Sequence, residues 1–414
     1  MSEYVIKGGI PLCGTVEVQG SKNSAVAILM ACIVVKGKVT LRRVPYISDV
    51  VRCIEILRYL GAVVEWHPDR TLSVDCSELE YVSISESLVG SIRASTYLMG
   101  ACLNRFGRCH FLQGGGCSLG RRPVDLHVGA LGAIGAELMM DGAMYMRNSP
   151  NGSFRFPAVT VGGTINAVVA AACGNGRCLF ENCAREPHVC DVVRFLNSCG
   201  ADIRGMGSSV LEVRGVDSLK GCDFVLSGDM IEGGTYLLAG VATRGVVTVK
   251  SVNPRELGAL CGVLDEAGVD VWIDGEAIGV SGEVKRGLRV ETGEYPLFPT
   301  DLHPQTVALM GSVPYNSVLC ERVFGCDRFG YLEQLGKQGL DYVIEGDRVS
   351  VFGGGYTSAS VCATDLRGGA ANVIAALCAD GESTVRRAEF IERGYSDMVL
   401  KLRALGAVMG YGGL

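Results

Sequence analysis

The 414-residue chain has few histidines and tryptophans, and it lacks both a basic excess and a long apolar run. It contains five histidines and two tryptophans. Its 38 lysines and arginines are outnumbered by 44 aspartates and glutamates, giving a formal net charge of -6, which argues against a general nucleic-acid-binding protein. The longest apolar runs, such as SAVAILMACIVV at 24–35, are too short to span a membrane, and the N-terminus has no apolar stretch typical of a signal peptide. These absences indicate a globular protein of the cytoplasm with no affinity for membranes or nucleic acid.

Cysteine is abundant, at 18 residues, but no two cysteines are spaced as C-x-x-C. In a long chain without an export signal, this usage indicates reduced thiols of the cytoplasm. Cys173, Cys178, Cys183 and Cys190 lie close enough in sequence to be considered as metal ligands. No histidine completes a ligand pattern with them, so we interpret them as small buried side chains and expect no metal ion.

A Leu-x-x-x-Gly unit followed by an apolar residue ends six helix-like patterns. The glycines are separated by 74, 65, 68, 71 and 67 residues, at Gly61, Gly135, Gly200, Gly268, Gly339 and Gly406. Glycine in this position ends a helix because it can take a positive φ. An apolar helical run, a glycine turn and a β-branched strand also recur, at 24–44, 166–183, 233–252 and 369–388. Units of this length exceed a thin solenoid repeat, so we predict an α/β protein of six βαβ-type repeats, three in each of two pseudo-symmetric domains.

A glycine-rich loop, QGGGCSLGRRP at 113–123, places Cys117 five residues before Arg122. Nearby arginines lower the pKa of a thiol and favour the thiolate, and a loop of this composition can close over a substrate. Pro123 suits the first turn of a helix, whose unpaired N–H groups favour an anion. These residues indicate either a reactive thiol beside an anion site or an inert surface cysteine.

Further cations precede or open expected helices in other repeats. Lys22 and Asn23 follow Ser21, and this arrangement indicates an anion site at a helix N-terminus or a solvated lysine beside a serine cap. Arg393 also precedes an expected helix, whereas Arg93 interrupts an apolar one at 90–100. If the repeats fold together, Lys22, Arg122 and Arg393 would surround a small anion of high charge.

Asp301 lies near the start of another expected helix, in YPLFPTDLHPQTVAL at 295–309. A carboxylate in this position is commonly a helix cap. Beside a polar substrate it can instead act as a general base.

Together these motifs resemble the enolpyruvyl transferases, and among them the enzymes that use UDP-N-acetylglucosamine as acceptor. The matching segments run in order along nearly the whole chain: GSKNSA at 20–25, CSLGRRPVDLH at 117–127, REP at 185–187, FPTDLHPQ at 298–305, ATDLRGGA at 363–370, ERGY at 392–395 and LRALGA at 402–407. The resemblance implies two inside-out α/β domains with threefold internal pseudo-symmetry. The first domain would span 21–228 and carry the Cys117 loop, and the second would combine 1–20 with 229–414.

The resemblance also implies a reaction. The 3-hydroxyl of UDP-N-acetylglucosamine adds to phosphoenolpyruvate, and the tetrahedral ketal then loses phosphate. This is the first committed step of peptidoglycan synthesis, on which the cell wall, cell shape and cell division depend, and it needs no metal or organic cofactor. By the same resemblance, Cys117 donates a proton, forms an adduct with phosphoenolpyruvate and is the residue that fosfomycin alkylates.

Site residues follow from the resemblance position by position. The expected catalytic residues are Lys22, Cys117, Asp301 and Arg393. Those expected to bind phosphoenolpyruvate are Lys22, Asn23, Arg93, Arg122, Asp365, Arg367 and Arg393. Those expected to bind UDP-N-acetylglucosamine are Asn23, Arg93, Arg122, Pro123, Val124, Asp125, Leu126, Thr160, Val161, Gly162, Asp301 and Val323, and Arg328 is a further candidate.

The sequence departs from the family pattern at three places. Ala158 stands where many relatives have a lysine near the nucleotide, the loop reads GGGC rather than PGGC, and LHPQ replaces a Met-Gln version after Asp301. Three alternatives stay open: a transferase that uses shikimate 3-phosphate, a non-catalytic regulator that binds a nucleotide sugar, and a purely structural repeat protein. The cysteine within CSLGRRPVDLH argues against the first, and the intact Lys22, Cys117, Asp301 and Arg393 argue against the second.

Overall fold

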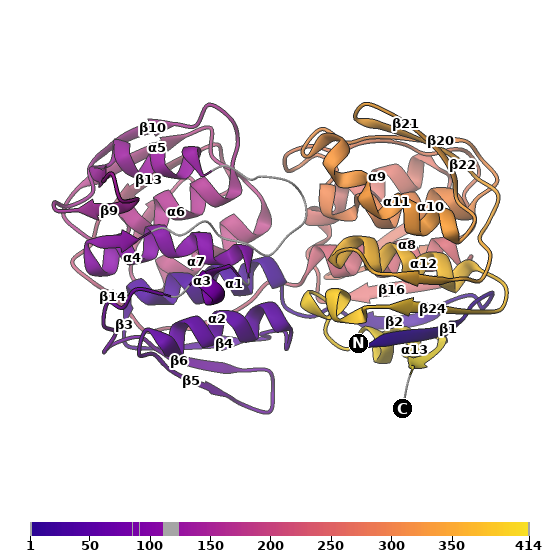
Figure 1. The fold of residues 1–414 in the computed structure, drawn as a ribbon, viewed down its shortest axis with the longest axis horizontal. Coiled ribbons are helices and arrows are strands. Elements are labelled where there is room, and N and C mark those ends of the chain that lie inside the picture. Colours follow the sequence, from indigo (N-terminus) through magenta and orange to yellow (C-terminus); the bar gives the residue numbers. More distant parts are fainter. Residues whose placement is uncertain (1, 85, 91, 111–123, 413–414) are drawn as a thin grey trace. The chain divides into compact units, whose positions relative to one another are not determined.

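A computed structural model describes residues 2–84, 86–90, 92–110 and 124–412. Contacts divide the chain into two compact units (Figure 1). Unit 1 combines Met1–Gln19 with Gly228–Leu414, and unit 2 is Gly20–Ser227. Cys117, Arg122 and Pro123 lie outside the described residues. None of the described helices is both long and apolar enough to cross a membrane.

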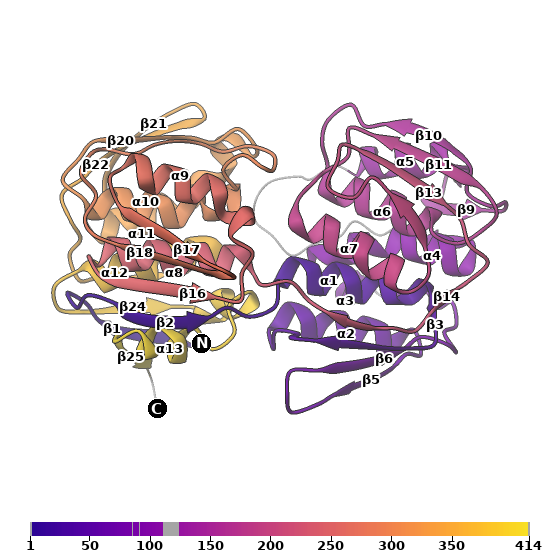
Figure 2. The ribbon, with the colours of Figure 1, turned by 180° about the vertical axis from the view of Figure 1, so that it is seen from behind.

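Unit 2 has buried helices at its centre and sheets at its periphery (Figure 2). The central helices are α1 (Lys22–Ala31), α4 (Leu98–Phe106) and α6 (Val161–Ala171), and the outer helices are α2 (Ser48–Tyr59), α3 (Glu86–Val89), α5 (Asp125–Ala133) and α7 (Pro187–Ser198). The described strands form the sheets β15-β4-β6-β5, β7-β9-β8 and β10-β11-β13-β12 and the pair β14-β3. Their bounds are β3 (Val35–Lys36), β4 (Lys38–Arg42), β5 (Val63–Trp66), β6 (Leu72–Asp75), β7 (Arg108–His110), β8 (Ala136–Leu138), β9 (Ala143–Met146), β10 (Gly152–Arg155), β11 (Arg177–Glu181), β12 (Asp202–Arg204), β13 (Val210–Arg214), β14 (Leu219–Lys220) and β15 (Asp223–Val225).

Unit 1 repeats this plan. Its central helices are α8 (Met230–Ala242), α10 (His303–Ser312) and α12 (Leu366–Cys378), and its outer helices are α9 (Gly258–Glu266), α11 (Leu332–Lys337) and α13 (Met398–Ala404). The described strands form the sheets β17-β18-β16-β2, β19-β20-β22-β21 and β23-β24-β1-β25. Their bounds are β1 (Glu3–Lys7), β2 (Cys13–Glu17), β16 (Val246–Lys250), β17 (Asp270–Asp274), β18 (Ala277–Ser281), β19 (Arg289–Glu291), β20 (Ser317–Cys320), β21 (Asp341–Glu345), β22 (Arg348–Phe352), β23 (Ser360–Cys362), β24 (Glu382–Arg386) and β25 (Val408–Tyr411).

The sheets are amphipathic and the central helices are apolar almost all round. In β4 and β22 every second residue is buried, as expected where one face of a strand covers a core and the other meets solvent. In α8 and α12 nearly every residue is buried, because neighbouring helices and the sheets enclose them. Helices inside and sheets outside confirm the inside-out α/β architecture.

Most repeats follow the order β-α-β-α-β-β, which extends the expected βαβ unit. In unit 1, β19 and β20 pair in parallel around α10, with Val290 opposite Leu319. After α11, β21 and β22 form a hairpin, and β22 pairs antiparallel with β20, with Leu319 opposite Val349. The parallel pair is joined by a buried helix, as a parallel crossover requires.

The N-terminal strands complete sheets whose other strands come from much later in the chain. β1 lies between β24 and β25, and β2 pairs in parallel with β16. Conversely, β15, at the end of unit 2, pairs in parallel with β4. The chain therefore passes between the units after Gln19 and again after Ser227.

The six repeat glycines have the predicted role. Each follows a helix C-terminus with φ between 87° and 108°. After α2, the N–H of Gly61 donates to the carbonyl of Arg58, and the N–H of Ala62 donates to that of Leu57, at 3.0 and 2.9 Å. This is a Schellman motif, and the same two bonds recur at Gly200, Gly268, Gly339 and Gly406. In these Leu-x-x-x-Gly units, the carbonyl of the leucine accepts from the residue after the glycine, as Leu57 accepts from Ala62. The side chain of the leucine is buried in the core.

Candidate functional site

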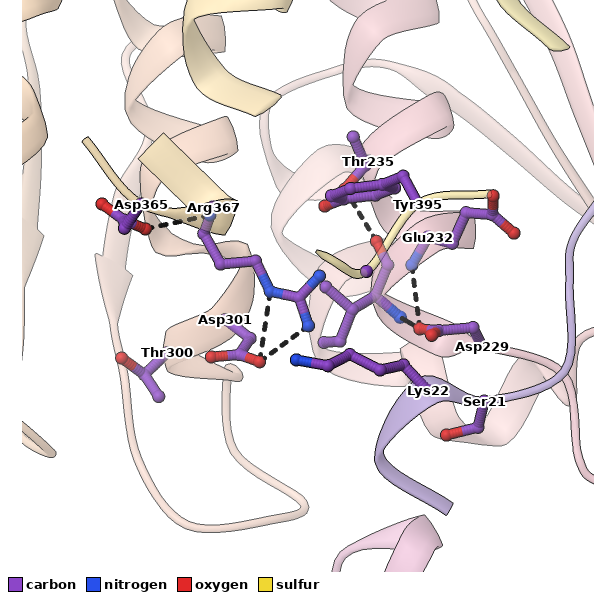
Figure 3. A network of polar contacts seen from close by, with 12 residues as sticks. Ser21, Lys22, Asp229, Glu232, Thr235, Thr300, Asp301, Asp365, Arg367 and Tyr395 are labelled. Carbon is purple, nitrogen blue, oxygen red and sulfur yellow. Dashed lines mark hydrogen bonds and ion pairs between the residues drawn. The ribbon is translucent and has the colours of Figure 1, made fainter. Parts of the chain in front are cut away.

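Two buried arginines of unit 1 bind Asp301. Figure 3 shows one of them, Arg367, with its bonds to the carboxylate. Asp301 lies in the 3-10 turn η4 (Thr300–Leu302), just before α10. Arg367 donates from Nη2 and Nε to Oδ2 at 2.9 and 3.2 Å, and Arg328 donates from Nη2 to Oδ1 at 3.3 Å. The arginine side chains are 5% and 3% exposed, whereas that of Asp301 is 32% exposed. The carboxylate of Asp301 therefore reaches solvent while two buried guanidinium groups hold it from within the protein.

Asp301 is not a helix cap. The N-cap positions of η4 and α10 are Pro299 and Leu302, and neither helix has a side-chain cap. The capping interpretation is therefore wrong, and the carboxylate serves in ion pairs instead.

Asp365 fixes the position of Arg367. It is the N-cap of α12, and its Oδ1 accepts from the N–H groups of Arg367 and Gly368 at 2.9 and 3.0 Å. Arg367 therefore lies in the first helical turn, with its guanidinium carbon 5.5 Å from the ring centre of Tyr395. Burial, the largest single effect, lowers the pKa of Arg367, but the charges of Asp301, Tyr395 and Asp229 and the hydrogen bond to Asp301 together outweigh it, so the pKa is raised and the guanidinium stays charged.

A buried polar network anchors the segment that carries Arg393. Gln305 Nε2 donates to Thr235 Oγ1 at 3.1 Å and to the Tyr395 hydroxyl at 3.0 Å, and these two hydroxyls lie 2.9 Å apart. Gln19 also binds this segment, because its Nε2 donates to the carbonyl of Gly394 at 2.7 Å. Arg393 itself ends the 3-10 turn η6 (Ala388–Arg393), five residues before α13 begins at Met398, so it does not open that helix.

Lys22 opens α1 in unit 2, as predicted. Ser21 is the N-cap, and its Oγ accepts from the N–H of Ser24 at 3.2 Å. The Lys22 side chain is only 13% exposed, and its Nζ lies 3.0 Å from Asp49 Oδ2. The serine cap is thus confirmed, but the lysine is paired and largely buried rather than solvated. Asn23 follows as the second residue of α1.

Two segments expected to bind the nucleotide lie side by side in unit 2. Thr160 is the N-cap of α6, accepting from the N–H of Gly163 at 3.2 Å, and Val161 and Gly162 form the first turn. A Cβ at Gly162 would lie 2.6 Å from His127 Cε1, so the helix meets the imidazole closely. His127 belongs to α5, whose N-cap is Val124 and whose first residues are Asp125 and Leu126.

The described part of α5 begins at Asp125, and Pro123, which we expect in the first turn of a helix, lies outside the described residues. Arg93 is expected inside an apolar helix, but it opens the 3-10 turn η2 (Arg93–Tyr97) ahead of α4. This difference reflects the low precision with which sequence patterns locate helix ends.

His127 is a buried, neutral imidazole. Asn166 donates from Nδ2 to its Nδ1 at 2.8 Å and to the carbonyl of Thr96 at 3.0 Å, while Asn166 Oδ1 accepts from the N–H of Gly100 at 2.7 Å. Burial, aided by the charge of Arg93, lowers the pKa of His127 from 6.5 to about 4. The imidazole therefore packs against α6 without bringing a charge to it at neutral pH.

Val323 and Ala158, also singled out in the sequence, are both exposed. Val323 is 42% exposed, and its N–H donates to Glu321 Oε1 at 2.9 Å. Ala158 is exposed, ahead of α6. Of the clustered cysteines, Cys178 and Cys183 are buried and Cys173 and Cys190 are partly buried. In the described ranges, no three His, Cys, Asp or Glu side chains gather to form a metal site.

Sequence reasoning missed several buried polar residues around Asp301, namely Thr235, Gln305, Glu321, His303 and Tyr331. Their signal is a polar side chain within an otherwise apolar helix or strand end, as at His303 and Gln305 in α10. Such a residue must find partners inside the core, because an unpaired buried polar group is costly.

Comparisons with known proteins agree over nearly the whole chain. The family model of EPSP synthase (3-phosphoshikimate 1-carboxyvinyltransferase) matches residues 6–402. The chain is 40% identical to UDP-N-acetylglucosamine 1-carboxyvinyltransferase 3 of Caldanaerobacter subterraneus, covering 98% of both chains. It is 38% identical to UDP-N-acetylglucosamine 1-carboxyvinyltransferase of Deinococcus deserti, covering 97% of this chain and 96% of the relative.

Solved structures show the same fold. The enolpyruvyl transferase NikO from Streptomyces tendae superposes with a TM-score of 0.85 at 25% identity, covering 99% of this chain and 98% of that one. EPSP synthase from Acinetobacter baumannii gives a TM-score of 0.74 at 17% identity, over the full length of both chains.

Proposed function

We propose, since the chain belongs to the enolpyruvyl transferase family that the EPSP synthase model describes, that it transfers the enolpyruvyl group of phosphoenolpyruvate to the 3-hydroxyl of UDP-N-acetylglucosamine. The observation that carries the acceptor is the match at 40% identity over 98% of the chain to a relative named for this activity. The Asp301 site supports this acceptor, because a sugar hydroxyl requires a base that is exposed to the substrate. Asp301 is partly exposed, and two buried arginines hold it in place.

The reaction that we propose is an addition followed by an elimination. Asp301 accepts the proton of the sugar 3-hydroxyl while that oxygen bonds to the central carbon of phosphoenolpyruvate, and a second proton is added to the methylene carbon. The resulting ketal loses a proton from its new methyl group as its bond to the phosphate oxygen breaks. Arg328 and Arg367 keep Asp301 ionised and directed for the first step, because each binds one of its two oxygens.

We assign the phosphoenolpyruvate site by the family pattern to Lys22, Asn23, Arg93, Arg122, Asp365, Arg367 and Arg393. Lys22 at the N-terminus of α1 supports this assignment, because a helix N-terminus and an ammonium group both favour an anion. Asp365 would act through Arg367, since its carboxylate caps α12. Cys117, outside the described residues, would supply the proton to the methylene carbon and react with fosfomycin.

The nucleotide sugar would be bound by Asn23, Arg93, Arg122, Pro123, Val124, Asp125, Leu126, Thr160, Val161, Gly162, Asp301 and Val323. The contact of α5 with the N-terminus of α6 supports a single pocket for the uridine and the diphosphate. At Ala158 there is no lysine charge, so the N–H groups at the start of α6 would contribute more of the attraction for the diphosphate.

Units 1 and 2 would be the two domains of the family, and the product would enter peptidoglycan synthesis in the cytoplasm, in support of the cell wall and of cell division. The contact boundaries after Gln19 and after Ser227 each lie one residue from the expected boundaries, which follow residues 20 and 228.

A comparison of acceptors tests the proposal. Purified protein and phosphoenolpyruvate are incubated with UDP-N-acetylglucosamine or with shikimate 3-phosphate, and released phosphate is measured. We expect phosphate only with the nucleotide sugar. Release only with shikimate 3-phosphate would reassign the acceptor, and nucleotide-sugar binding without any release would identify a regulator.

A further inference from the structure

One buried carboxylate in unit 1 joins two segments of the candidate site. Glu321 is fully buried at the end of β20. Its Oε1 accepts from the N–H groups of Val323 and Phe324 at 2.9 and 3.1 Å, and its Oε2 accepts from Thr300 Oγ1 at 2.9 Å. One side chain therefore ties the turn that carries Asp301 to the loop that leads to Arg328.

His303 adds a second tie between the same segments. It is fully buried, and its Nδ1 lies 3.0 Å from Glu321 Oε2, although off the axis of a hydrogen bond. Its Nε2 lies 3.0 Å from the Tyr331 hydroxyl, and the ring meets Phe329 and Tyr331 edge-on at 5.5 Å between centres. Both aromatic residues belong to η5 (Gly325–Tyr331), the 3-10 turn that carries Arg328.

The protonation states agree with this geometry. Burial lowers the pKa of His303, against the opposing pull of Glu321, and burial raises the pKa of Tyr331. A neutral imidazole would place its proton on Nδ1, toward the carboxylate, and accept the proton of Tyr331 at Nε2. Oε2 of Glu321 also accepts from the hydroxyl of Thr300, while its Oε1 accepts from Val323 and Phe324. The carboxylate therefore has donors from both segments.

The direct links between these segments are longer. Arg328 Nη2 reaches the carbonyl of Thr300 at 3.2 Å and Asp301 Oδ1 at 3.3 Å. The bonds of Glu321 are shorter, between 2.9 and 3.1 Å, and its side chain is fully buried, so they hold the two segments more closely.

We propose that the buried His303–Glu321 pair is a positioning device, which sets the Asp301 turn against the Arg328 segment and so directs the Asp301 carboxylate. The proposal rests on the proposed function, in which Asp301 is the base for the acceptor hydroxyl. His303 stands within LHPQ, where the sequence departs from the family pattern.

Two variants loosen the device without changing Asp301, and a third preserves part of it. His303→Leu removes the ring nitrogens, Thr300→Val removes one hydroxyl, and His303→Gln retains a polar group that can reach Glu321. Tyr356→Phe is the matched control, because its hydroxyl donates to the carbonyl of Ala308, farther along the same helix α10, at 3.0 Å.

Steady-state turnover is the first readout. We expect His303→Leu to lower kcat by roughly 10- to 100-fold, since a displacement of about 1 Å can cost on the order of 100-fold. The KM for phosphoenolpyruvate should stay within about twofold of wild type, because neither His303 nor Glu321 is among the residues assigned to that substrate. Thr300→Val should show a smaller loss, His303→Gln should recover most of kcat, and Tyr356→Phe should leave kcat intact.

Amide hydrogen exchange is the second readout, and it does not depend on activity. None of the bonds described above joins His303 directly to Val323 or Phe324. In the proposed device, Glu321 links His303 to both amides. We expect His303→Leu to speed exchange at these two amides by about tenfold or more, with little change in Tyr356→Phe.

The outcomes separate the two proposals. A wild-type protein that forms no enolpyruvyl product would refute the proposed function. An active wild type whose kcat is unchanged in His303→Leu, or unchanged exchange at Val323 and Phe324, would overturn the positioning role. If His303→Leu fails to fold, Thr300→Val decides by the same two readouts.

Discussion

Replacing Asp301 by asparagine should have two separable effects. The variant keeps the size of the side chain but leaves Arg328 and Arg367, both nearly buried, without the carboxylate that they bind. It also removes the proposed base. Stability and turnover should therefore both fall, for different reasons.

The loss of stability follows from burial. Breaking a fully buried ion pair costs about 3–5 kcal/mol, because a charge is left in the core without compensation. Asp301 is 32% exposed, so water already screens part of the interaction. We therefore expect a loss of about 1–2 kcal/mol, equivalent to a fall in Tm of roughly 3–6 °C for a domain of this size.

The loss of turnover follows from the chemistry. Without a general base, kcat should fall by about 10²- to 10⁴-fold. In Asp301→Ala, added acetate should restore part of kcat, because a small carboxylate can bind between the two arginines. Asp347→Asn, which breaks an exposed pair with Arg322 in the same unit, serves as the control and should change neither property.

Turnover by stopped assay and unfolding by urea check both parts. An Asp301→Asn protein with wild-type kcat would refute the assignment of the base. An unchanged unfolding midpoint would refute the reasoning about the buried arginines.

Three further predictions concern other parts of the chain. Gly200→Ala should lower the free energy of unfolding in urea by about 1–2 kcal/mol, because its φ of 101° is costly for alanine, although no atom lies within 4 Å of the new Cβ. Gly262→Ala, inside α9, should instead raise that free energy by about 0.5–1 kcal/mol. Equal effects of the two variants would contradict the role of the repeat glycines. Between pH 6.5 and about 4, His127 binds a proton in the unfolded chain but not when it is buried in the folded protein, so the free energy of unfolding should fall by about 3 kcal/mol as the pH falls through this window. His127→Gln should flatten the dependence of this free energy on pH. Parallel dependences in the variant and the wild type would disprove the role of His127. Cys117→Ser should abolish labelling by fosfomycin and sharply lower turnover near neutral pH, and a fully active variant that is still labelled would rule out the proposed thiol.

The repeats could be predicted because their signal is local. A leucine four residues before a glycine specifies a helix end by itself, since the bonds of a Schellman motif span only six residues. All six sites have the expected positive φ. In the described part of the chain, three sheets surround the central helices of unit 1, and three sheets and the pair β14-β3 surround those of unit 2. The pairing of β1 with β24 and of β15 with β4 could not be predicted, because partners hundreds of residues apart leave no mark on either strand alone.

The site was only partly predictable for a related reason. Asp301 and Arg367 could be singled out by motif, but their ion pair depends on how η4 and α12 meet in the fold. Glu321 and His303 were missed because a buried polar pair has no periodic pattern. The capping of α12 by Asp365 is again local, yet only the structure shows that it positions Arg367.

Mass spectrometry of the product formed in D₂O tests the central claim most directly. Purified protein is given phosphoenolpyruvate and UDP-N-acetylglucosamine, and the nucleotide sugar is analysed. We predict an enolpyruvyl ether that carries deuterium in its methylene group, because the addition step places a solvent-derived proton on that carbon before the elimination. Recovery of unmodified nucleotide sugar from folded protein would contradict the proposed function, and an ether without deuterium would contradict the addition–elimination route.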